Sequence, residues 1–187
     1  MGLLEKIDRW DVEFLAKVHQ YHTPFWNDFM CLITEKYPWI PLYLIIIGYL
    51  LYKYRLKGLY IIASISGLVI LSDFIASGIC KPFFERLRPC HDASVNHLLN
   101  SPCGCGGQYG FFSSHAATTF SLAGSMVMLF KQNKWIWLFV FWAAIVSFSR
   151  VYLGVHYLSD ITVGAIIGSL WSVIYWYLMR DKLYIPR

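Results

Sequence analysis

Side chains that could carry chemistry lie in short polar stretches between long apolar segments. The stretch KPFFERLRP contains Lys81 and Arg88, and the stretch SRVYLGVHYLSD contains Arg150, His156 and Asp160. Arginine presents a planar fork that matches phosphate oxygens, and lysine adds a point charge. Because cations at membrane depth are costly unless they are paired or ligated, this set predicts a bound anion. The convergence of so many donors favours phosphate over carboxylate.

The segment FSSH, residues 112–115, offers an anion site of a second kind. Ser113 and Ser114 stand at the start of an apolar segment that is expected to be a helix. A helix N-terminus presents free backbone N–H groups and the positive end of the helix dipole. We therefore add both serines to the predicted phosphate site.

Two histidines complete the candidate site. His156 and Asp160 are four residues apart, which places both side chains on one face of a helix. A carboxylate that accepts from one ring nitrogen fixes the tautomer and leaves the other nitrogen free as a nucleophile. His115 is predicted to protonate the leaving oxygen, so His156 must be neutral and His115 charged. Phosphate-monoester hydrolysis needs on the order of 20 kcal/mol of barrier lowering, which favours a cage of cations together with a covalent phosphohistidine.

The composition predicts that membrane helices position these residues. Hydrophobic residues make up 57% of the 187 residues, charged residues make up 14%, and the mean hydropathy is +0.49. Soluble domains are roughly a quarter charged. We expect one all-α, integral membrane domain over residues 1–187.

The net charge of +5 does not predict nucleic-acid binding, because the basic residues are scattered at helix ends. The first residues, MGLLEKIDRWDVEF, are charged too early for a signal peptide.

About five spanning helices are predicted within a transmembrane core of residues 38–180. Their segments are 39–54, 58–80, 114–130, 135–151 and 160–179. The catalytic residues fall in two loops, 81–115 and 149–160.

Residues 1–37 are predicted to form interfacial helices ahead of this core. Apolar residues of segment 3–18 recur at three- and four-residue spacing opposite charged ones, which is typical of an amphipathic interfacial helix. Segment 23–34 is too short to cross a bilayer by itself. A spanning helix that continues through Pro24 or Pro38 is the alternative.

The loops alternate between two sides of the membrane, and their cations predict the orientation. Both sides carry equal numbers of basic residues, so the orientation is predicted from the basic clusters that directly follow helix ends. These clusters are Lys53, Arg55 and Lys57, then Lys131 and Lys134, then Arg180, Lys182 and Arg187. We predict that this side faces the cytoplasm and that the candidate site faces outward.

Cysteines of the long polar loop leave alternatives open. A disulfide from Cys90 to Cys103 or Cys105 and free thiols fit the sequence about equally well. The C-x-C spacing of Cys103 and Cys105 is weak evidence for zinc.

Other polar residues are also open to two interpretations. Asp73 forms an i, i+4, i+8 row with Ser77 and Lys81, so it either orients Lys81 or forms a hydrogen bond within the bundle. Arg86 and Glu85 either pair with each other or face solvent, or they take part in the site. Lone histidines are predicted to be polar residues of the interface: His19, His22, His91 and His97. Gly164 and Gly168 are predicted to form a packing face.

The motifs resemble the signatures of the type 2 phosphatidic acid phosphatase (PAP2) superfamily. Residues 81–89, KPFFERLRP, match the first signature, Lys, six residues, Arg-Pro. Residues 149–160 match the third, Ser-Arg, five residues, His, three residues, Asp. The second, Pro-Ser-Gly-His, is similar to residues 112–115, with Phe112 in place of proline and Ser114 in place of glycine.

The resemblance implies a role for each matched residue. His156 would be the nucleophile, Asp160 its orienting partner and His115 the acid. Phosphate would be held by Lys81, Arg88, Ser113, Arg150 and the backbone of Ser114. No metal and no cofactor are implied.

We therefore expect a metal-independent membrane lipid phosphatase, with the site facing the periplasm or exterior of a bacterial cytoplasmic (inner) membrane. Its expected partners are a lipid phosphate substrate and membrane lipids, with neither nucleic acid nor an obligate protein partner. Undecaprenyl diphosphate is narrowly favoured over phosphatidylglycerophosphate, phosphatidate and lipid A. The alternatives are a vanadate-dependent haloperoxidase-like enzyme and a non-enzymatic protein that binds or transports anionic lipids.

Overall fold

The computed structural model describes residues 2–183, and that part of the chain is a bundle of helices with one isolated β-bridge. The α-helices are α1 (Leu3–His19), α2 (Pro24–Thr34), α3 (Ile40–Tyr54), α4 (Leu56–Phe74), α5 (Lys81–Phe84), α6 (Ser114–Leu129), α7 (Leu138–Tyr152) and α8 (Leu158–Leu183). The shorter helical turns are η1 (Tyr37–Trp39), η2 (Ile75–Cys80), η3 (Pro89–His91), η4 (Asn96–Leu98) and η5 (Lys134–Trp137). Met1 and residues 184–187 lie outside the described residues. The two ends of the predicted domain and Arg187 of the last basic cluster therefore lie outside them as well.

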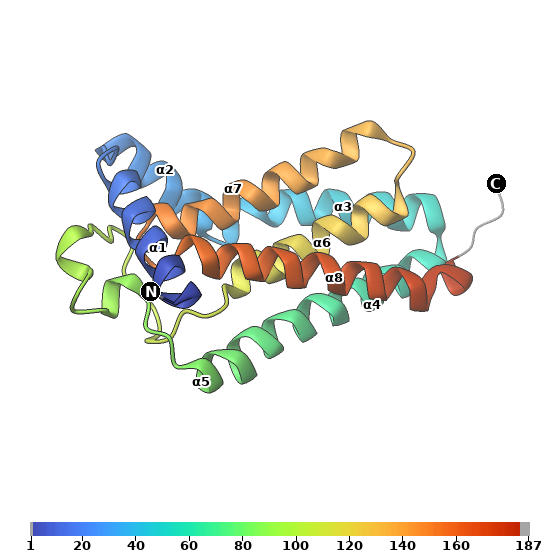
Figure 1. Cartoon of the computed structure of the whole chain (residues 1–187). Helices are drawn as coiled ribbons and strands as arrows, with labels where there is room; N and C mark the ends of the chain where they lie inside the picture. The colour runs from blue at the N-terminus through green and yellow to red at the C-terminus, as the bar shows by residue number, and fades with distance from the viewer. Residues whose placement is uncertain (1, 184–187) are drawn as a thin grey trace.

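The long helices run side by side at the predicted spans (Figure 1), which confirms the all-α membrane fold class. Three helices within residues 2–183 are long and apolar enough to cross a membrane: Leu56–Phe84, Lys134–Tyr152 and Leu158–Asp181. The bent pair of α2 and α3 qualifies as a fourth when its two parts are counted together. The predicted number of five spans is approximate, because α6 has only 16 residues and carries many hydroxyl groups.

The N-terminal helices α1 and α2 lie at one end of the bundle, beside the long loop that follows α5 (Figure 1). Leu3, Leu4 and Trp10 of α1 point outward and are largely exposed, as an interfacial helix requires. The axis bends by 65° between α2 and the helical segment that starts at Tyr37. Segment 23–34 therefore does not continue through Pro38 as a straight spanning helix.

Small residues let α6 and α8 approach closely, as predicted for Gly164 and Gly168. A Cβ atom on Gly164 would lie 2.6 Å from the carbonyl oxygen of Ser113 and 3.0 Å from the Cβ atom of Ala116. One on Gly168 would lie 3.0 Å from the carbonyl carbon of Ala117. Close backbone approach through small residues is how membrane helices gain packing contacts. This contact fixes the N-terminus of α6 against α8.

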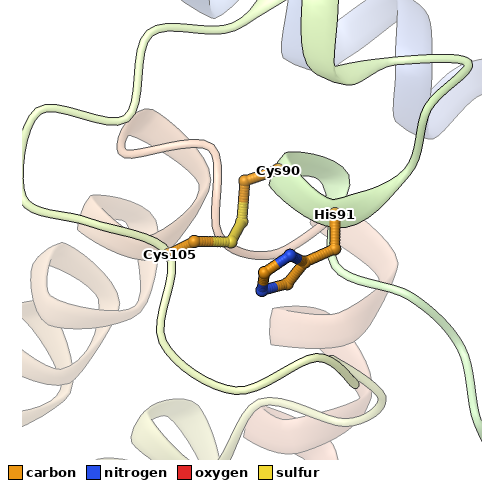
Figure 2. A group of neighbouring side chains, drawn as sticks. All are labelled: Cys90, His91 and Cys105. Carbon is orange, nitrogen blue, oxygen red and sulfur yellow. A yellow bond between two sulfur atoms is a disulfide. The ribbon is translucent and has the colours of Figure 1, made fainter.

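Two disulfides fasten the loop between α5 and α6. Cys90 is bonded to Cys105, one of the two pairings left open, and His91 lies beside this bond (Figure 2). Cys103 is bonded to Cys31 of α2, a partner that the sequence did not suggest.

The side chain of His91 and the sulfur atoms of Cys90 and Cys105 form a compact group. Because both sulfurs are used in the disulfide, this group offers a metal only one ring nitrogen.

Candidate active site

The turn between α7 and α8 explains the spacing of the motif that contains both Arg150 and His156. Gly154 has a φ of +68°, in the left-handed region where glycine commonly ends a helix. The carbonyl oxygen of Arg150 accepts hydrogen bonds from Val155 at 3.1 Å and from His156 at 3.2 Å. His156 therefore leaves the turn just before α8 begins, and Asp160 lies in the first turn of that helix.

His156 and Asp160 form a buried pair, with exposed fractions of 1% and 0%. The Nδ1 atom of His156 lies 3.3 Å from Oδ2 of Asp160, and the same oxygen accepts the backbone N–H of Tyr157 at 3.0 Å. Burial lowers the pKa of His156 to about 4, against the opposing effect of its hydrogen bond with Asp160. The ring is therefore neutral at pH 7. Its Nδ1–H group can donate to Asp160, which leaves a lone pair on Nε2.

Lys81 is held by the row of polar side chains that the sequence indicated. Its Nζ atom donates to Ser77 Oγ and to Ser114 Oγ, both at 3.3 Å. Ser77 in turn donates to Asp73 Oδ1 at 3.4 Å. Of the two interpretations of Asp73, the contacts favour the one in which it orients Lys81.

Arg88 is held by the backbone of the disulfide-bonded loop. Its Nε atom donates to the carbonyl of Tyr109 at 3.2 Å, and Nη1 donates to the carbonyl of Cys105 at 3.1 Å. The backbone N–H of Arg88 donates to the carbonyl of Gln108 at 3.0 Å. Burial lowers the pKa of Arg88, although Asp160 opposes this effect. A buried arginine that rests on carbonyl groups keeps its positive charge available for an anion.

The N-terminus of α6 lies against the first turn of α8. Ser113 is fully buried, and its N–H donates to the carbonyl of Asp160 at 3.1 Å. The hydroxyl oxygen of Ser113 accepts the N–H of Ala116 at 3.5 Å, so Ser113 caps the helix. The backbone N–H of Ser113 is thus already used, while its hydroxyl hydrogen and the N–H groups of Ser114 and His115 stay available for an anion.

Arg150 comes from the last turn of α7. Its Nη1 atom donates to Thr34 Oγ1 at 2.6 Å. Its Nε atom is buried and has no hydrogen-bond partner among the described residues. A buried donor without a partner is costly, so it marks a place where a ligand oxygen would be stabilised.

The three motifs converge on one space, as the sequence predicted. The ring of His115 interacts electrostatically with Arg150, His156, Lys81 and Arg88. A neutral imidazole, a second imidazole and three cations thus face one another at the end of the bundle that also carries α1 and α2.

Three contacts of this region were not expected from the sequence. Arg86 pairs with Asp8, Asp11 and Asp160, so the interpretations in which it pairs with Glu85 or faces solvent are wrong. The partners lie in α1 and α8, far from residue 86 in the chain, and α1 showed only an ordinary polar face.

Gly110 also lies against the histidine pair. A Cβ atom there would lie 3.2 Å from Asp160 Oδ2 and 3.5 Å from His156 Nδ1. No pattern in the sequence indicated this close approach.

Two of the lone histidines pack inside the protein and do not simply face the interface. His22 stacks on Tyr152 with ring centroids 4.1 Å apart, and its Nε2 atom lies 2.8 Å from the Tyr152 carbonyl oxygen. His19 stacks on His22 at 4.2 Å. Burial lowers the pKa of both rings. These histidines connect α1 to the end of α7 next to the candidate site.

Comparison with known proteins agrees with this geometry. Residues 60–184 match the PAP2 superfamily. A lipid A 4′-phosphatase of Bacteroides thetaiotaomicron is 32% identical over 182 residues, which are 94% of this chain and 80% of that protein. An undecaprenyl-diphosphatase of Sulfolobus acidocaldarius is 26% identical over 164 residues, which are 85% of this chain and 73% of that protein.

The fold has a counterpart among solved structures. The crystal structure of a transmembrane PAP2-type phosphatidylglycerolphosphate phosphatase from Bacillus subtilis superposes with a TM-score of 0.68. The two chains are 23% identical, and the match covers 97% of this chain and 90% of that one. The present chain belongs to the PAP2 superfamily. It is an integral membrane phosphatase of the PAP2 type.

Proposed function

We propose that the protein hydrolyses a phosphate group on a membrane lipid through a phosphohistidine formed at His156. One observation carries the proposal: a buried, neutral imidazole is held by Asp160 at one nitrogen and lies beside Arg88 and Arg150, and these two arginines also lie near His115 together with Lys81. The cations Lys81, Arg88 and Arg150 bind the phosphate oxygens together with the hydroxyl of Ser113 and the backbone of Ser114. Neither a metal nor a cofactor takes part in these steps.

The mechanism has two displacements at phosphorus. Nε2 of His156 attacks the phosphorus atom, the bond from phosphorus to the lipid oxygen breaks, and His115 donates a proton to that oxygen. A water molecule then attacks the phosphohistidine and gives a proton to His115, the N–P bond breaks, and inorganic phosphate leaves. The cations stabilise the charge on the equatorial oxygens in both steps.

Phosphate binding and protonation of His115 are expected to support each other. Three cations near His115 oppose a fourth positive charge in the unliganded site. A phosphate dianion neutralises much of this field, which favours the charged imidazole that the first step needs.

A lipid substrate is supported by a cavity of about 390 Å³ among α3, α4, α6 and α7. Thr118 lines it one helical turn after His115, and Lys36 is a charged residue of the lining. The other lining residues are mainly apolar, among them Tyr43, Ile46, Ile62, Val69, Leu122 and Trp142. We infer that this cavity takes apolar chains of the substrate near the phosphate cage.

Among lipid phosphates we propose the 4′-phosphate of lipid A as the first candidate. The lipid A 4′-phosphatase relative is more similar to this chain, at 32% identity, than the undecaprenyl-diphosphatase, at 26%. This reverses the narrow preference for undecaprenyl diphosphate that the sequence suggested. Phosphatidylglycerophosphate and phosphatidate rank behind both.

We further propose that residues 1–187 act as one domain in a bacterial inner membrane, with the site facing the periplasm. The two disulfides support this orientation, because both lie at the end of the bundle that carries the site. Disulfides persist in oxidising compartments such as the periplasm and are rare in the cytosol.

A phosphate-release panel tests the proposal. Purified protein is given lipid A, undecaprenyl diphosphate, phosphatidylglycerophosphate and phosphatidate in the presence of EDTA, beside a His156→Ala variant. We expect release from at least one lipid, greatest with lipid A, and none from the variant. Full release by His156→Ala would overturn the mechanism. Halide oxidation with added vanadate but no phosphate release would favour the haloperoxidase alternative, and binding without turnover would favour the non-enzymatic one.

A further inference from the structure

Arg86 joins the carboxylate of the candidate catalytic pair to the first helix of the chain. Its Nη1 atom donates to Asp160 Oδ1 and to Ser159 Oγ, both at 2.7 Å. Its Nη2 atom donates to Asp11 Oδ2 at 2.8 Å and to Asp8 Oδ1 at 2.9 Å. Four acceptors on two helices thus surround one guanidinium group that is only 23% exposed.

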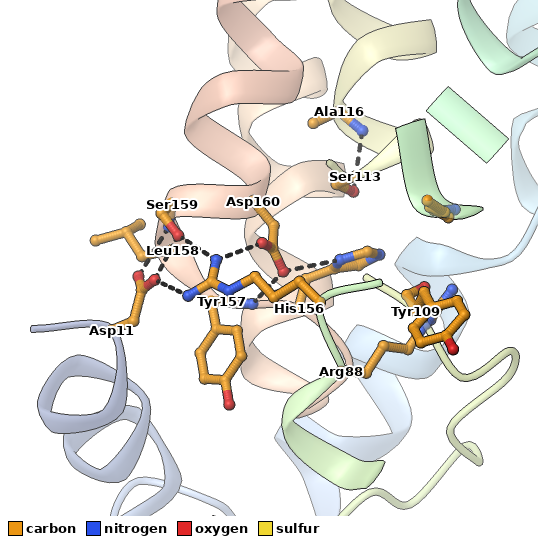
Figure 3. Close-up of polar contacts among 12 residues, drawn as sticks. Asp11, Arg88, Tyr109, Ser113, Ala116, His156, Tyr157, Leu158, Ser159 and Asp160 are labelled. Atoms are coloured by element: carbon orange, nitrogen blue, oxygen red, sulfur yellow. Dashed lines mark hydrogen bonds and ion pairs between the residues drawn. The ribbon is translucent and has the colours of Figure 1, made fainter. Parts of the chain in front are cut away.

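Asp11 is the buried end of this network. Its side chain is 4% exposed, although it belongs to the polar face of an interfacial helix. Besides Arg86, it accepts the N–H of Ser159 at 2.9 Å and the hydroxyl of Ser159. Figure 3 shows Asp11, Ser159, Asp160 and His156 following one another across the start of α8. A buried carboxylate is tolerated only when it is fully paired, so this contact fixes α1 on α8.

The two oxygens of Asp160 have separate partners. Oδ2 faces Nδ1 of His156 and the N–H of Tyr157, while Oδ1 faces Arg86. The guanidinium also lies over the ring of Tyr157, 4.4 Å from its centroid. With both oxygens engaged, the carboxylate cannot rotate away from the imidazole.

Arg86 differs from the cations of the phosphate cage in the partners of its guanidinium group. Both of its Nη atoms are occupied by carboxylates or a hydroxyl. Arg88 instead donates to backbone carbonyls, and Arg150 keeps a buried Nε atom without a partner among the described residues. Phosphate oxygens would therefore have to displace the carboxylates of Arg86, whereas they can add to the donors of the other two.

We propose that Arg86 and Asp11 are positioning residues of the reaction. Arg86 holds the carboxylate of Asp160 in the orientation that keeps the His156 ring aligned, and Asp11 of α1 holds Arg86. The interfacial helix α1 is thus part of the active-site support although it contributes no group that touches the substrate. The inference rests on the proposed role of His156 as the nucleophile.

Four variants test this inference: Arg86→Gln, Arg86→Lys, Asp11→Asn and the control Glu13→Gln, which removes an exposed acidic charge from the same helix. The kcat of Arg86→Gln should fall by about 10- to 100-fold, the range found when a metal-bound histidine loses the partner that orients it. KM and inhibition by orthovanadate, a phosphate mimic, should change by less than about threefold, because the phosphate cage stays intact. Arg86→Lys should recover part of the kcat, Asp11→Asn should lose less of it than Arg86→Gln does, and Glu13→Gln should match the wild type.

The pH profile supplies a readout that loss of packing alone would not give. The titratable and charged groups that face His156 are Asp160, His115, Arg88 and Arg150, with Arg86 behind Asp160. Removing the cation in Arg86→Gln makes protonation of His156 easier, so the acid limb of kcat/KM should move to higher pH. Removing the anion in Asp11→Asn should move it to lower pH.

The outcomes separate the inference from the proposed function. Loss of orthovanadate inhibition with unchanged kcat would make Arg86 a phosphate ligand and would overturn the inference. Unchanged kcat and unchanged pH limits would also overturn it, even if the variants unfold at lower temperature. A wild-type protein that releases phosphate from no lipid would instead refute the proposed function itself.

Discussion

In the proposed mechanism, the reactivity of the His156 imidazole depends on burial. An ordinary histidine has a pKa near 6.5, whereas burial lowers that of His156 to about 4. The folded site therefore holds the ring neutral over a pH range in which a solvated histidine would be largely protonated. A neutral ring is what nucleophilic attack requires.

The pH dependence of catalysis follows from this shift. In the proposed mechanism, attack needs neutral His156, so kcat/KM should be maintained as the pH falls through 6.5 and should be lost only as it approaches about 4. The ring also binds a proton more weakly in the folded than in the unfolded state. Its contribution to stability is therefore complete above about pH 6.5 and is lost as the pH falls toward 4.

A pH–rate profile checks the kinetic expectation. The profile must be corrected for the phosphate of the substrate, which itself titrates at about pH 6. Half-loss of the corrected kcat/KM near pH 6.5 would show that His156 behaves as a solvated imidazole.

At the scale of elements, the close contact of α6 and α8 positions Ser113 at the proposed phosphate site. In Gly164→Ala, the new Cβ atom would meet the Ser113 carbonyl oxygen at 2.6 Å, and this oxygen belongs to backbone that cannot easily move. We expect activity to fall by about tenfold or more, because small displacements of positioned groups are costly in catalysis. Gly67→Ala in α4 is the matched control, since no atom lies within 4 Å of its Cβ position. Equal activity of the two variants, measured as phosphate release, would contradict this role of the contact.

The disulfide between Cys90 and Cys105 stabilises the loop that supports Arg88. Replacing both cysteines with serine should lower the free energy of unfolding by about 2–4 kcal/mol. It should also raise KM, because the Cys105 carbonyl that accepts from Arg88 is no longer fixed. Thermal unfolding and phosphate-release kinetics measure the two effects. Cys80→Ser, at the free cysteine of the described chain, is the control. Unchanged KM in the double variant would show that the loop positions Arg88 without the disulfide.

At the scale of the whole molecule, the orientation in the membrane decides which lipids the site can reach. A cysteine-directed, membrane-impermeant reagent should label Asn100→Cys from outside intact cells and should not label Gln132→Cys. Residue 100 lies in the loop at the site end of the bundle, and residue 132 lies in the turn between α6 and α7 at the opposite end. Labelling of Gln132→Cys alone would place the site in the cytoplasm.

Much of the fold and of the candidate site could be predicted from the sequence. Hydropathy located the long helices because membrane spans must be apolar along their length. The site residues could be grouped because His156 and Asp160 are one helical turn apart, and because the other motifs lie at the same ends of predicted spans. Arg86 could not be interpreted, because its partner Asp11 is 75 positions away in a helix whose docking depends on tertiary packing. The bond from Cys31 to Cys103, 72 positions apart, escaped prediction for the same reason.

The central claim is that His156 becomes phosphorylated during turnover. The most direct measurement is to incubate the protein with lipid A that carries ³²P at the 4′-phosphate and to quench in alkaline detergent, because phosphohistidine is labile to acid. Peptide mapping of the trapped protein should place the label on His156, and the label should be absent from His156→Ala. Labelling of another residue would contradict the account, and so would undiminished phosphate release without any label on His156.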